Sequence, residues 1–175
     1  MPKTNPPAYA MSLNICAWMT SSLAPFGVTA HQTPALWWRG PGGSEIYLGA
    51  VITDPKATTA ELAGPLQNVQ ANWHGGEFYL YDCWGTRDLA DLGFERVVKN
   101  PWYLRLPAPV PPLSIPSDVA IERVSSPGEL AEFEAASWMG FDDSDDPAPG
   151  RVAFSMHPAA TLDDPNMYYL IARTN

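Results

Sequence analysis

The 175-residue sequence contains little cysteine, few basic residues and no long hydrophobic run. Its two cysteines, Cys16 and Cys83, lie far apart in the sequence and form no C-x-x-C pair, which argues against a disulfide framework and against a zinc site. A reducing, cytoplasmic compartment is therefore expected. No segment approaches the stretch of about 18 apolar residues that suggests a membrane span, and the N-terminus lacks the apolar core of a signal peptide.

Basic residues are also too few for nucleic-acid binding. Lys and Arg total 10 against 19 Asp and Glu, which gives a formal net charge of −9. Such a surface repels the phosphates of nucleic acids and of anionic lipids, so neither is expected as a partner. The histidines His31, His74 and His157 stand apart without metal-binding spacing. The acidic segment 141–147 (FDDSDDP) lacks the glycine and the distal glutamate of a calcium loop, so we expect no metal site.

What the sequence does contain is the composition of a packed globular protein: 46% hydrophobic residues, with seven Trp, seven Tyr and six Phe. The apolar pattern predicts, in order, a helix over 8–22, strands over 35–38 and 45–53, a helix in the later part of 54–73, a strand over 77–82, a short helix over 86–93 and an extended run over 94–106. Residues 39–44 (RGPGGS) are expected to form a hairpin loop of about four to six residues.

A proline-rich segment, residues 107–118, cannot form a packed element and is the expected domain boundary. Beyond it the pattern restarts with a strand over 119–124, a helix over 125–141 and a strand over 167–173. The helix has clear start signals, because Ser126 caps it, Pro127 suits its first position and Glu129 completes an S-x-x-E capping box. Together these elements predict an α+β fold with a mixed sheet.

The short helix, the Leu92-Gly93-Phe94 turn and the extended run after it resemble the end of the fold of the GNAT acetyltransferase superfamily. The order of strands and helices over residues 34–106 is similar to that fold. After the linker, AIERVSSPGELAEFEAASW and YYLIART look like the first strand, first helix and second strand of another such lobe. The resemblance implies a degenerate GNAT-like lobe (1–106), a linker (107–118) and the incomplete beginning of a second lobe (119–175).

Members of this family transfer an acetyl group from acetyl-CoA to an amine. The resemblance therefore implies acetyl-CoA as the cofactor of complete relatives, and a small-molecule amine, or none, as the partner of this chain. Val51, Ile52 and Thr53 match the strand that pairs with the pantetheine arm of the coenzyme. Trp138 and His157 are assigned to substrate binding, and ordinary packing is the alternative for both. No residue is identified as catalytic.

The loop that binds the coenzyme pyrophosphate in this family is written Gln/Arg-x-x-Gly-x-Gly/Ala, and here its three positions fall on Thr58, Glu61 and Ala63. Glu61 would place a carboxylate where the coenzyme needs backbone N–H groups. Pro65 lacks an N–H and is expected to interrupt any helix that begins at Thr59. The phosphate site of this lobe is therefore expected to be lost.

The position of the family's general-acid tyrosine is occupied by Leu89, which cannot transfer a proton. The chain is thus expected to be an N-terminal portion of a GNAT-type N-acetyltransferase, inactive alone and without tight binding of acetyl-CoA. Whether it acts as an enzyme stays open. The alternative is a non-catalytic GNAT-like binding or dimerisation module, with a homodimer formed through the unfinished second lobe at the strand edge near 167–173.

Overall fold

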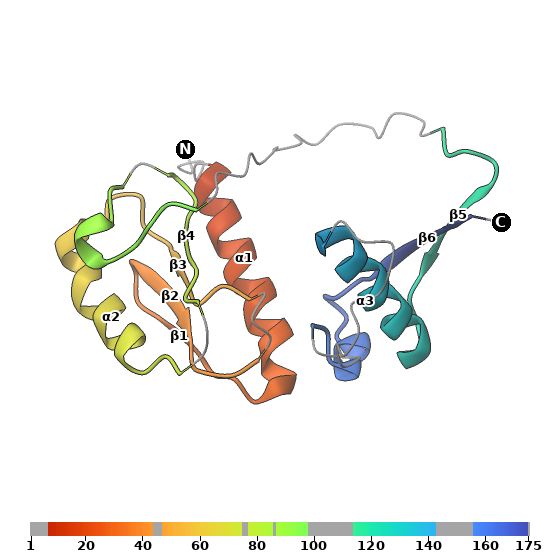
Figure 1. The fold of residues 1–175 in the computed structure, drawn as a ribbon, viewed down its shortest axis with the longest axis horizontal. Helices are drawn as coiled ribbons and strands as arrows, with labels where there is room; N and C mark the ends of the chain where they lie inside the picture. Colours follow the sequence, from red (N-terminus) through yellow and green to blue (C-terminus); the bar gives the residue numbers. More distant parts are fainter. Residues whose placement is uncertain are drawn as a thin grey trace, which may run out of the picture. The chain divides into compact units, whose positions relative to one another are not determined.

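The computed structural model describes residues 7–43, 47–74, 77–85, 87–97, 114–142 and 156–174 (Figure 1). The chain divides into two compact units, Met1–Leu104 (unit 1) and Arg105–Asn175 (unit 2). Of the expected linker, residues 107–118, only 114–118 fall within the described residues. In the described part of the chain, no helix combines the length and the apolar character that crossing a membrane requires.

Unit 1 is built on a mixed four-stranded sheet with the strand order β1-β2-β3-β4. Its elements are α1 (Pro7–Leu23), the 3₁₀ turn η1 (Ala24–Phe26), β1 (Ala30–Gln32), β2 (Leu36–Arg39), β3 (Ala50–Ile52), α2 (Thr59–Ala71), β4 (Leu80–Asp82) and the 3₁₀ turn η2 (Ala90–Leu92). Strands β1, β2 and β3 pair antiparallel, whereas β3 and β4 are parallel and are joined through α2. The predicted α+β class with a mixed sheet is confirmed.

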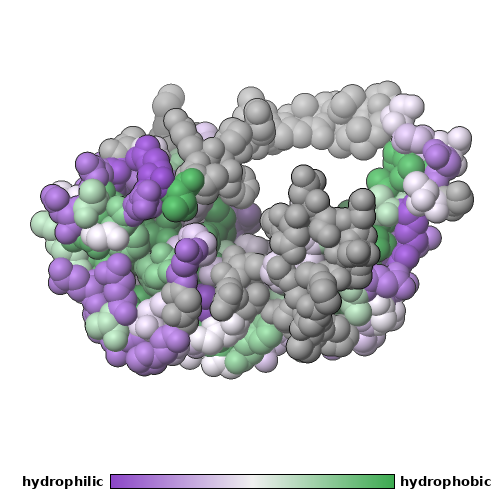
Figure 2. Space-filling model, viewed as in Figure 1, coloured by the Kyte–Doolittle hydropathy of each residue, from purple (hydrophilic) through white to green (hydrophobic). Residues whose placement is uncertain are grey.

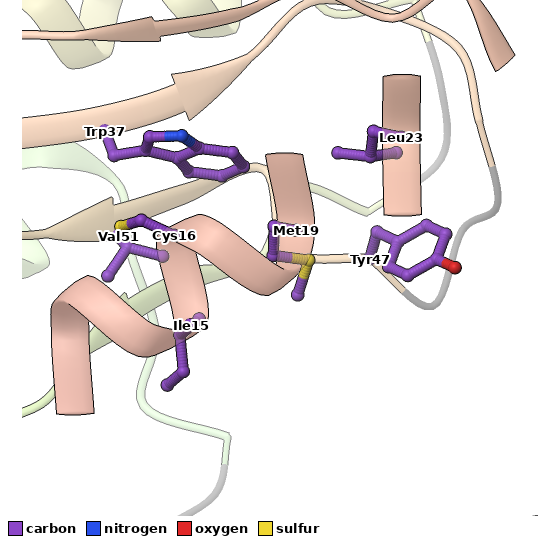
Figure 3. Packing of buried hydrophobic residues seen from close by; sticks show 7 residues of the cluster. All are labelled: Ile15, Cys16, Met19, Leu23, Trp37, Tyr47 and Val51. Carbon is purple, nitrogen blue, oxygen red and sulfur yellow. The ribbon is translucent and has the colours of Figure 1, made fainter. Parts of the chain in front are cut away.

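Helices α1 and α2 cover opposite faces of this sheet (Figure 1). Because side chains alternate between the two faces of a strand, Trp37 and Val51 pack against α1, while their neighbours Leu36 and Ile52 pack against α2. Figure 3 shows the buried cluster on the α1 side, which consists of Ile15, Cys16, Met19, Leu23, Trp37, Tyr47 and Val51. The surface of unit 1 that is visible in Figure 2 is a mixture of hydrophilic and hydrophobic residues.

Helix α2 shows that one expectation was wrong, because it runs through Pro65 without interruption. A proline inside a helix costs about 3 kcal/mol, whereas fully burying an aliphatic side chain contributes about 1.5–3 kcal/mol. Leu62 and Leu66 are buried against the sheet and Val69 is also buried, so packing outweighs the defect. Gly64 also helps, since it has no Cβ to clash with the following proline ring.

The loop between β2 and β3 takes up part of the strand expected over 45–53, because β3 begins only at Ala50 and the described residues 47–49 belong to no strand. Arg39 organises this loop: its guanidinium group donates to the carbonyl groups of Gly42, Tyr47 and Leu48. The group lies 4.5 Å from the centroid of the Trp73 ring and is only 3% exposed, so burial lowers the pKa of Arg39. Arg39 therefore holds the glycine-rich loop in place through hydrogen bonds to its carbonyl groups.

Gly49 marks a close approach between the end of this loop and the segment before β4. A Cβ atom added to Gly49 would lie 2.3 Å from a ring carbon of Phe78. The Phe78 ring is itself held by Trp73 at 5.0 Å and by Phe94 at 6.0 Å between ring centroids. Because Gly49 has no side chain, the Phe78 ring can pack directly against the backbone at this position.

Two further elements of unit 1 are shorter than predicted. The strand expected over 77–82 comprises Leu80–Asp82, and the helix expected over 86–93 is reduced to the turn Ala90–Leu92. Gly93 follows that turn with φ +81°, a left-handed conformation that favours glycine. Of the extended run expected over 94–106, the structure describes only residues 94–97, which form no strand.

Unit 2 comprises β5 (Val119–Arg123), α3 (Pro127–Asp142), the 3₁₀ turn η3 (Ala159–Asp163) and β6 (Leu170–Thr174), and β5 pairs antiparallel with β6. The predicted capping box is confirmed: Glu129 N donates to Ser126 Oγ at 3.3 Å, and Ser126 N donates to the Glu129 carboxylate at 3.0 Å. The core is formed by Val124, Leu130, Met167 and Tyr169, with Phe133, Leu162 and Ile171 packed against it.

Candidate functional site

The N-terminus of α2 is the position where the expected pyrophosphate loop opens a helix, and there it is bound by a side chain of the protein itself. Thr58 N donates to Glu61 Oε2 at 2.7 Å, Thr58 Oγ1 lies 2.9 Å from the same oxygen, and Glu61 N donates to Thr58 Oγ1 at 3.3 Å. The hydrogen bonds from Thr58 lower the pKa of Glu61. A carboxylate thus occupies the helix end that would attract an external anion.

The loop between β3 and α2 is fixed by a second group, Arg87. Its Nη2 donates to the Asp54 carbonyl oxygen at 2.7 Å and its Nε to the Ala57 carbonyl oxygen at 3.1 Å. Its Nη1 pairs with Asp82 Oδ1 at 3.0 Å, and the two side chains are 8% and 13% exposed. The guanidinium carbon also lies 5.7 Å from the centroid of the Trp84 ring. Arg87 therefore ties the loop to the end of β4.

This arrangement fills the carboxyl edge of the parallel pair β3 and β4, which is where open α/β sheets bind their ligands. Three carbonyl and carboxylate groups converge on Arg87, and its positive charge is matched by Asp82. The groups that this loop turns towards Arg87 are carbonyl oxygens, which accept hydrogen bonds, whereas a phosphate needs N–H donors. The residues present do not fit a coenzyme pyrophosphate at this edge.

Val51, Ile52 and Thr53, the residues matched to the pantetheine strand, are buried in unit 1, with 0%, 0% and 2% exposure. Val51 and Ile52 belong to β3, which is paired with β2 on one side and with β4 on the other. Thr53 donates through its backbone to the Ala35 carbonyl and through Oγ1 to the Pro34 carbonyl, at 2.9 and 3.0 Å. Pairing of a ligand with this strand would require β3 and β4 to separate.

Leu89, at the position of the family's general acid, lies directly before η2 and packs against the cluster on the α2 side of the sheet. Its carbonyl oxygen accepts hydrogen bonds from Leu92 N at 3.0 Å and from Phe94 N at 3.2 Å. The residue therefore has a structural role in the Leu-Gly-Phe turn. It offers no proton to a leaving group.

His157, assigned to substrate binding, lies in a buried polar cluster of unit 2. The Glu134 carboxylate, on α3, is 2% exposed and accepts hydrogen bonds from Met156 N at 2.8 Å and from His157 N. The His157 ring centroid lies 4.9 Å from that of Tyr169, whose hydroxyl donates to Thr161 Oγ1 at 2.8 Å. Burial lowers the pKa of His157, and the nearby Glu134 opposes this shift.

Trp138, the other residue assigned to substrate binding, is half-buried on α3, one turn beyond Glu134. The roles of Trp138 and His157 in substrate binding stay predictions. In the described ranges, no group of His, Cys, Asp and Glu side chains is arranged to hold a metal ion. The acidic segment 141–147 lies outside the described residues from position 143 onwards.

Sequence reasoning missed two important side chains, Glu134 and Arg87. A signal existed for Glu134, because it stands four residues after the buried Leu130 on the apolar face of α3. Arg87 had no such signal in the sequence, since its partners at Asp54 and Ala57 come from a loop about thirty residues earlier. Comparison with protein families, with curated proteins and with solved structures finds no match to this chain.

Proposed function

We propose that this chain is a portion of a GNAT-type N-acetyltransferase, which transfers an acetyl group from acetyl-CoA to an amine, and that unit 1 serves it as a non-catalytic lobe. The order of strands in unit 1 supports the proposal. An antiparallel set, β1 to β3, is followed by a helical crossover to the parallel strand β4. The resemblance implies this order around the coenzyme strand.

The non-catalytic role of unit 1 rests on the occupied N-terminus of α2. Glu61 there satisfies Thr58 N, and Arg87 holds the preceding loop through its carbonyl groups. An incoming pyrophosphate would meet a carboxylate at the helix end, and two like charges in contact repel each other. No step of acetyl transfer is therefore assigned to unit 1.

Isothermal titration of the purified chain with acetyl-CoA tests this proposal. We expect no saturable binding at coenzyme concentrations up to about 1 mM, which corresponds to a binding free energy weaker than about −4 kcal/mol. A Kd in the micromolar range would contradict the non-catalytic lobe.

A parallel assay follows release of the coenzyme thiol in the presence of primary amines. Turnover by this chain would contradict the assignment of acetyl transfer to another part of the enzyme.

A non-catalytic dimerisation module is the second candidate function. It is favoured by one observation in unit 2, where the face of the β5–β6 pair opposite to α3 exposes large hydrophobic side chains. This candidate predicts that the protein acts through self-association, with or without a coenzyme.

A further inference from the structure

Three acceptor oxygens and one aromatic ring surround the guanidinium group of Arg87 at the carboxyl edge of β3 and β4. The oxygens are the carbonyl groups of Asp54 and Ala57 and the Oδ1 atom of Asp82, at 2.7, 3.1 and 3.0 Å. The ring is that of Trp84, whose centroid lies 5.7 Å from the guanidinium carbon. We call these four groups the cation cage. Carbonyl and carboxylate oxygens accept hydrogen bonds, and an aromatic face attracts positive charge, so the cage has the chemistry of a cation site.

The cage is held in place by contacts that do not involve Arg87. Asp82 Oδ1 also accepts a hydrogen bond from Trp84 N at 3.0 Å, which orients the carboxylate. In the loop between β3 and α2, Lys56 N donates to Asp54 Oδ1 at 2.8 Å. The acceptors are therefore expected to keep their places when the Arg87 side chain is removed. Acceptors that are already ordered bind a ligand without the cost of ordering them.

Asp82 has more binding capacity than Arg87 uses. Arg87 Nη1 contacts Oδ1, while the buried Oδ2 has no hydrogen-bond partner among the residues that the structure describes. Arg87 is tethered to its own backbone and to two carbonyl groups, whereas a free guanidinium ion can turn to pair with both oxygens of a carboxylate. The cage therefore offers a free ligand one contact that Arg87 does not make.

The Arg87 side chain reaches the cage from the surface of unit 1, since Gly85 and Asp88 on either side of it are exposed. Truncation of this side chain to Cβ removes the group that closes the cage at that point. It also leaves the Asp82 carboxylate, which is only 13% exposed, without its cation. A mostly buried carboxylate without a partner strongly favours the uptake of a positive charge.

We propose that the carboxyl edge of β3 and β4 is a guanidinium-binding site whose resident ligand is the side chain of Arg87. The class of ligand is an alkylguanidinium ion, which is opposite in charge to a coenzyme pyrophosphate. Ethylguanidinium reproduces Arg87 atom for atom from Cγ outwards, so it fits the space that Arg87→Ala vacates. This inference goes beyond the proposed function and does not depend on acetyl-CoA binding.

Titration of Arg87→Ala, in the whole chain, with ethylguanidinium chloride at constant ionic strength tests the proposal. NMR follows the indole N–H signal of Trp84, whose ring belongs to the cage. We expect saturable binding with a Kd on the order of a few millimolar. The wild-type signal is expected to stay unchanged, because Arg87 already fills the site. Butylammonium lacks the planar fork of a guanidinium group and is expected to bind at least about 10-fold more weakly.

Two further variants serve as controls for the site. Arg87→Met fills the cage with an uncharged side chain and is expected to bind no ethylguanidinium. Addition of Asp82→Asn to Arg87→Ala removes the negative charge of the cage and is expected to raise the Kd for ethylguanidinium at least about 10-fold. Undiminished binding in either control variant would place the ligand elsewhere and overturn the proposal.

Far-UV circular dichroism keeps the test decisive if Arg87→Ala is unfolded in buffer. Ethylguanidinium is then expected to restore the wild-type spectrum of Arg87→Ala, and butylammonium is not. The proposal is overturned by a folded Arg87→Ala that shows no saturable binding up to about 50 mM ligand. Equal binding of the two cations overturns it as well, as does an unfolded Arg87→Ala that ethylguanidinium does not refold.

Discussion

Thr58 and Glu61 hydrogen-bond to each other in both directions at the N-terminus of α2, with Thr58 N and Glu61 Oε2 2.7 Å apart. The pair satisfies two N–H groups that a helix leaves without intrahelical partners. It also places a negative charge at the positive end of the helix dipole. In the proposed function, the hydrogen bonds that stabilise the helix are also the contacts that keep a phosphate from its N-terminus.

Thr58→Ala is expected to lower the free energy of unfolding of unit 1 by about 1 kcal/mol, because it removes the cap hydroxyl. Urea denaturation followed by tryptophan fluorescence measures this change. Thr59→Ala is the matched control, since Thr59 is the first residue of α2 and does not cap it. Equal destabilisation by both substitutions would argue against the capping role.

Arg87→Ala is expected to destabilise unit 1 by about 3 kcal/mol, because it leaves the mostly buried Asp82 without its ion-pair partner. Arg87→Lys cannot reproduce a planar group that reaches two carbonyls and a carboxylate, so it is expected to recover only part of this loss. Arg96→Ala serves as the control, because Arg96 contacts carbonyl groups in an exposed setting. A loss from Arg87→Ala that is no larger than the control loss would contradict the role of Arg87 in fixing the loop.

The stability of unit 2 is expected to fall as the pH drops below about 6.5, the ordinary pKa of histidine. Burial lowers the pKa of His157 in the folded protein, so between the folded and the ordinary value the unfolded chain binds more protons. Protonation therefore favours unfolding in this window. Glu134, on α3, is the charged group that opposes the shift, and Tyr169 adjoins the ring from the segment before β6.

An NMR titration of the His157 ring and urea denaturation at several pH values check this prediction. In His157→Gln, which cannot titrate, the fall in stability of unit 2 between pH 7 and pH 5 is expected to be smaller. Identical pH dependence of the two proteins would rule out His157 as the responsible group. His31, which stacks on Trp38 in unit 1, provides a reference signal in the same spectra.

Both thiols are expected to resist alkylation in the native protein. Desolvation raises the pKa of Cys16 and of Cys83 to about 12, and Cys83 packs against the cluster that contains Cys16. The reactive thiolate is therefore scarce at pH 8. Mass spectrometry after treatment with iodoacetamide is expected to find little label in buffer and two labels in urea. Rapid labelling of either cysteine in buffer would contradict this expectation.

Local patterns in the sequence predicted local structure well. The spacing of Ser126 and Glu129 predicted the start of α3, and the structure has that capping box. Thr58 and Glu61 have the same spacing, so the cap of α2 was readable by the same rule. The apolar pattern over 8–22 predicted α1, in which Ile15 and Met19 are buried.

Long-range contacts were beyond such patterns. Pro65 indicated a break in α2 because its local cost is evident in the sequence, whereas the compensating burial of Leu62 and Leu66 depends on the sheet beneath them. Arg87 was hidden for a related reason, since its role exists only after β4 has paired with β3. The pantetheine strand and the substrate-binding residues stay predictions, because a resemblance supplies positions without the packing around them.

The contact between Gly49 and Phe78 limits which sequences this fold can accept. An added Cβ at Gly49 would clash with the Phe78 ring, which would then have to move from its contacts with Trp73 and Phe94. Gly64, by contrast, has nothing within 4 Å of an added Cβ outside its two chain neighbours, so its constraint is local and comes from the ring of Pro65 that follows it. In a saturation mutagenesis library selected for folding, position 49 is expected to retain glycine, whereas position 64 is expected to accept alanine once Pro65 is replaced by alanine. The two glycines look alike in the sequence, but Gly49 is constrained by a residue distant in the sequence and Gly64 by the proline that follows it.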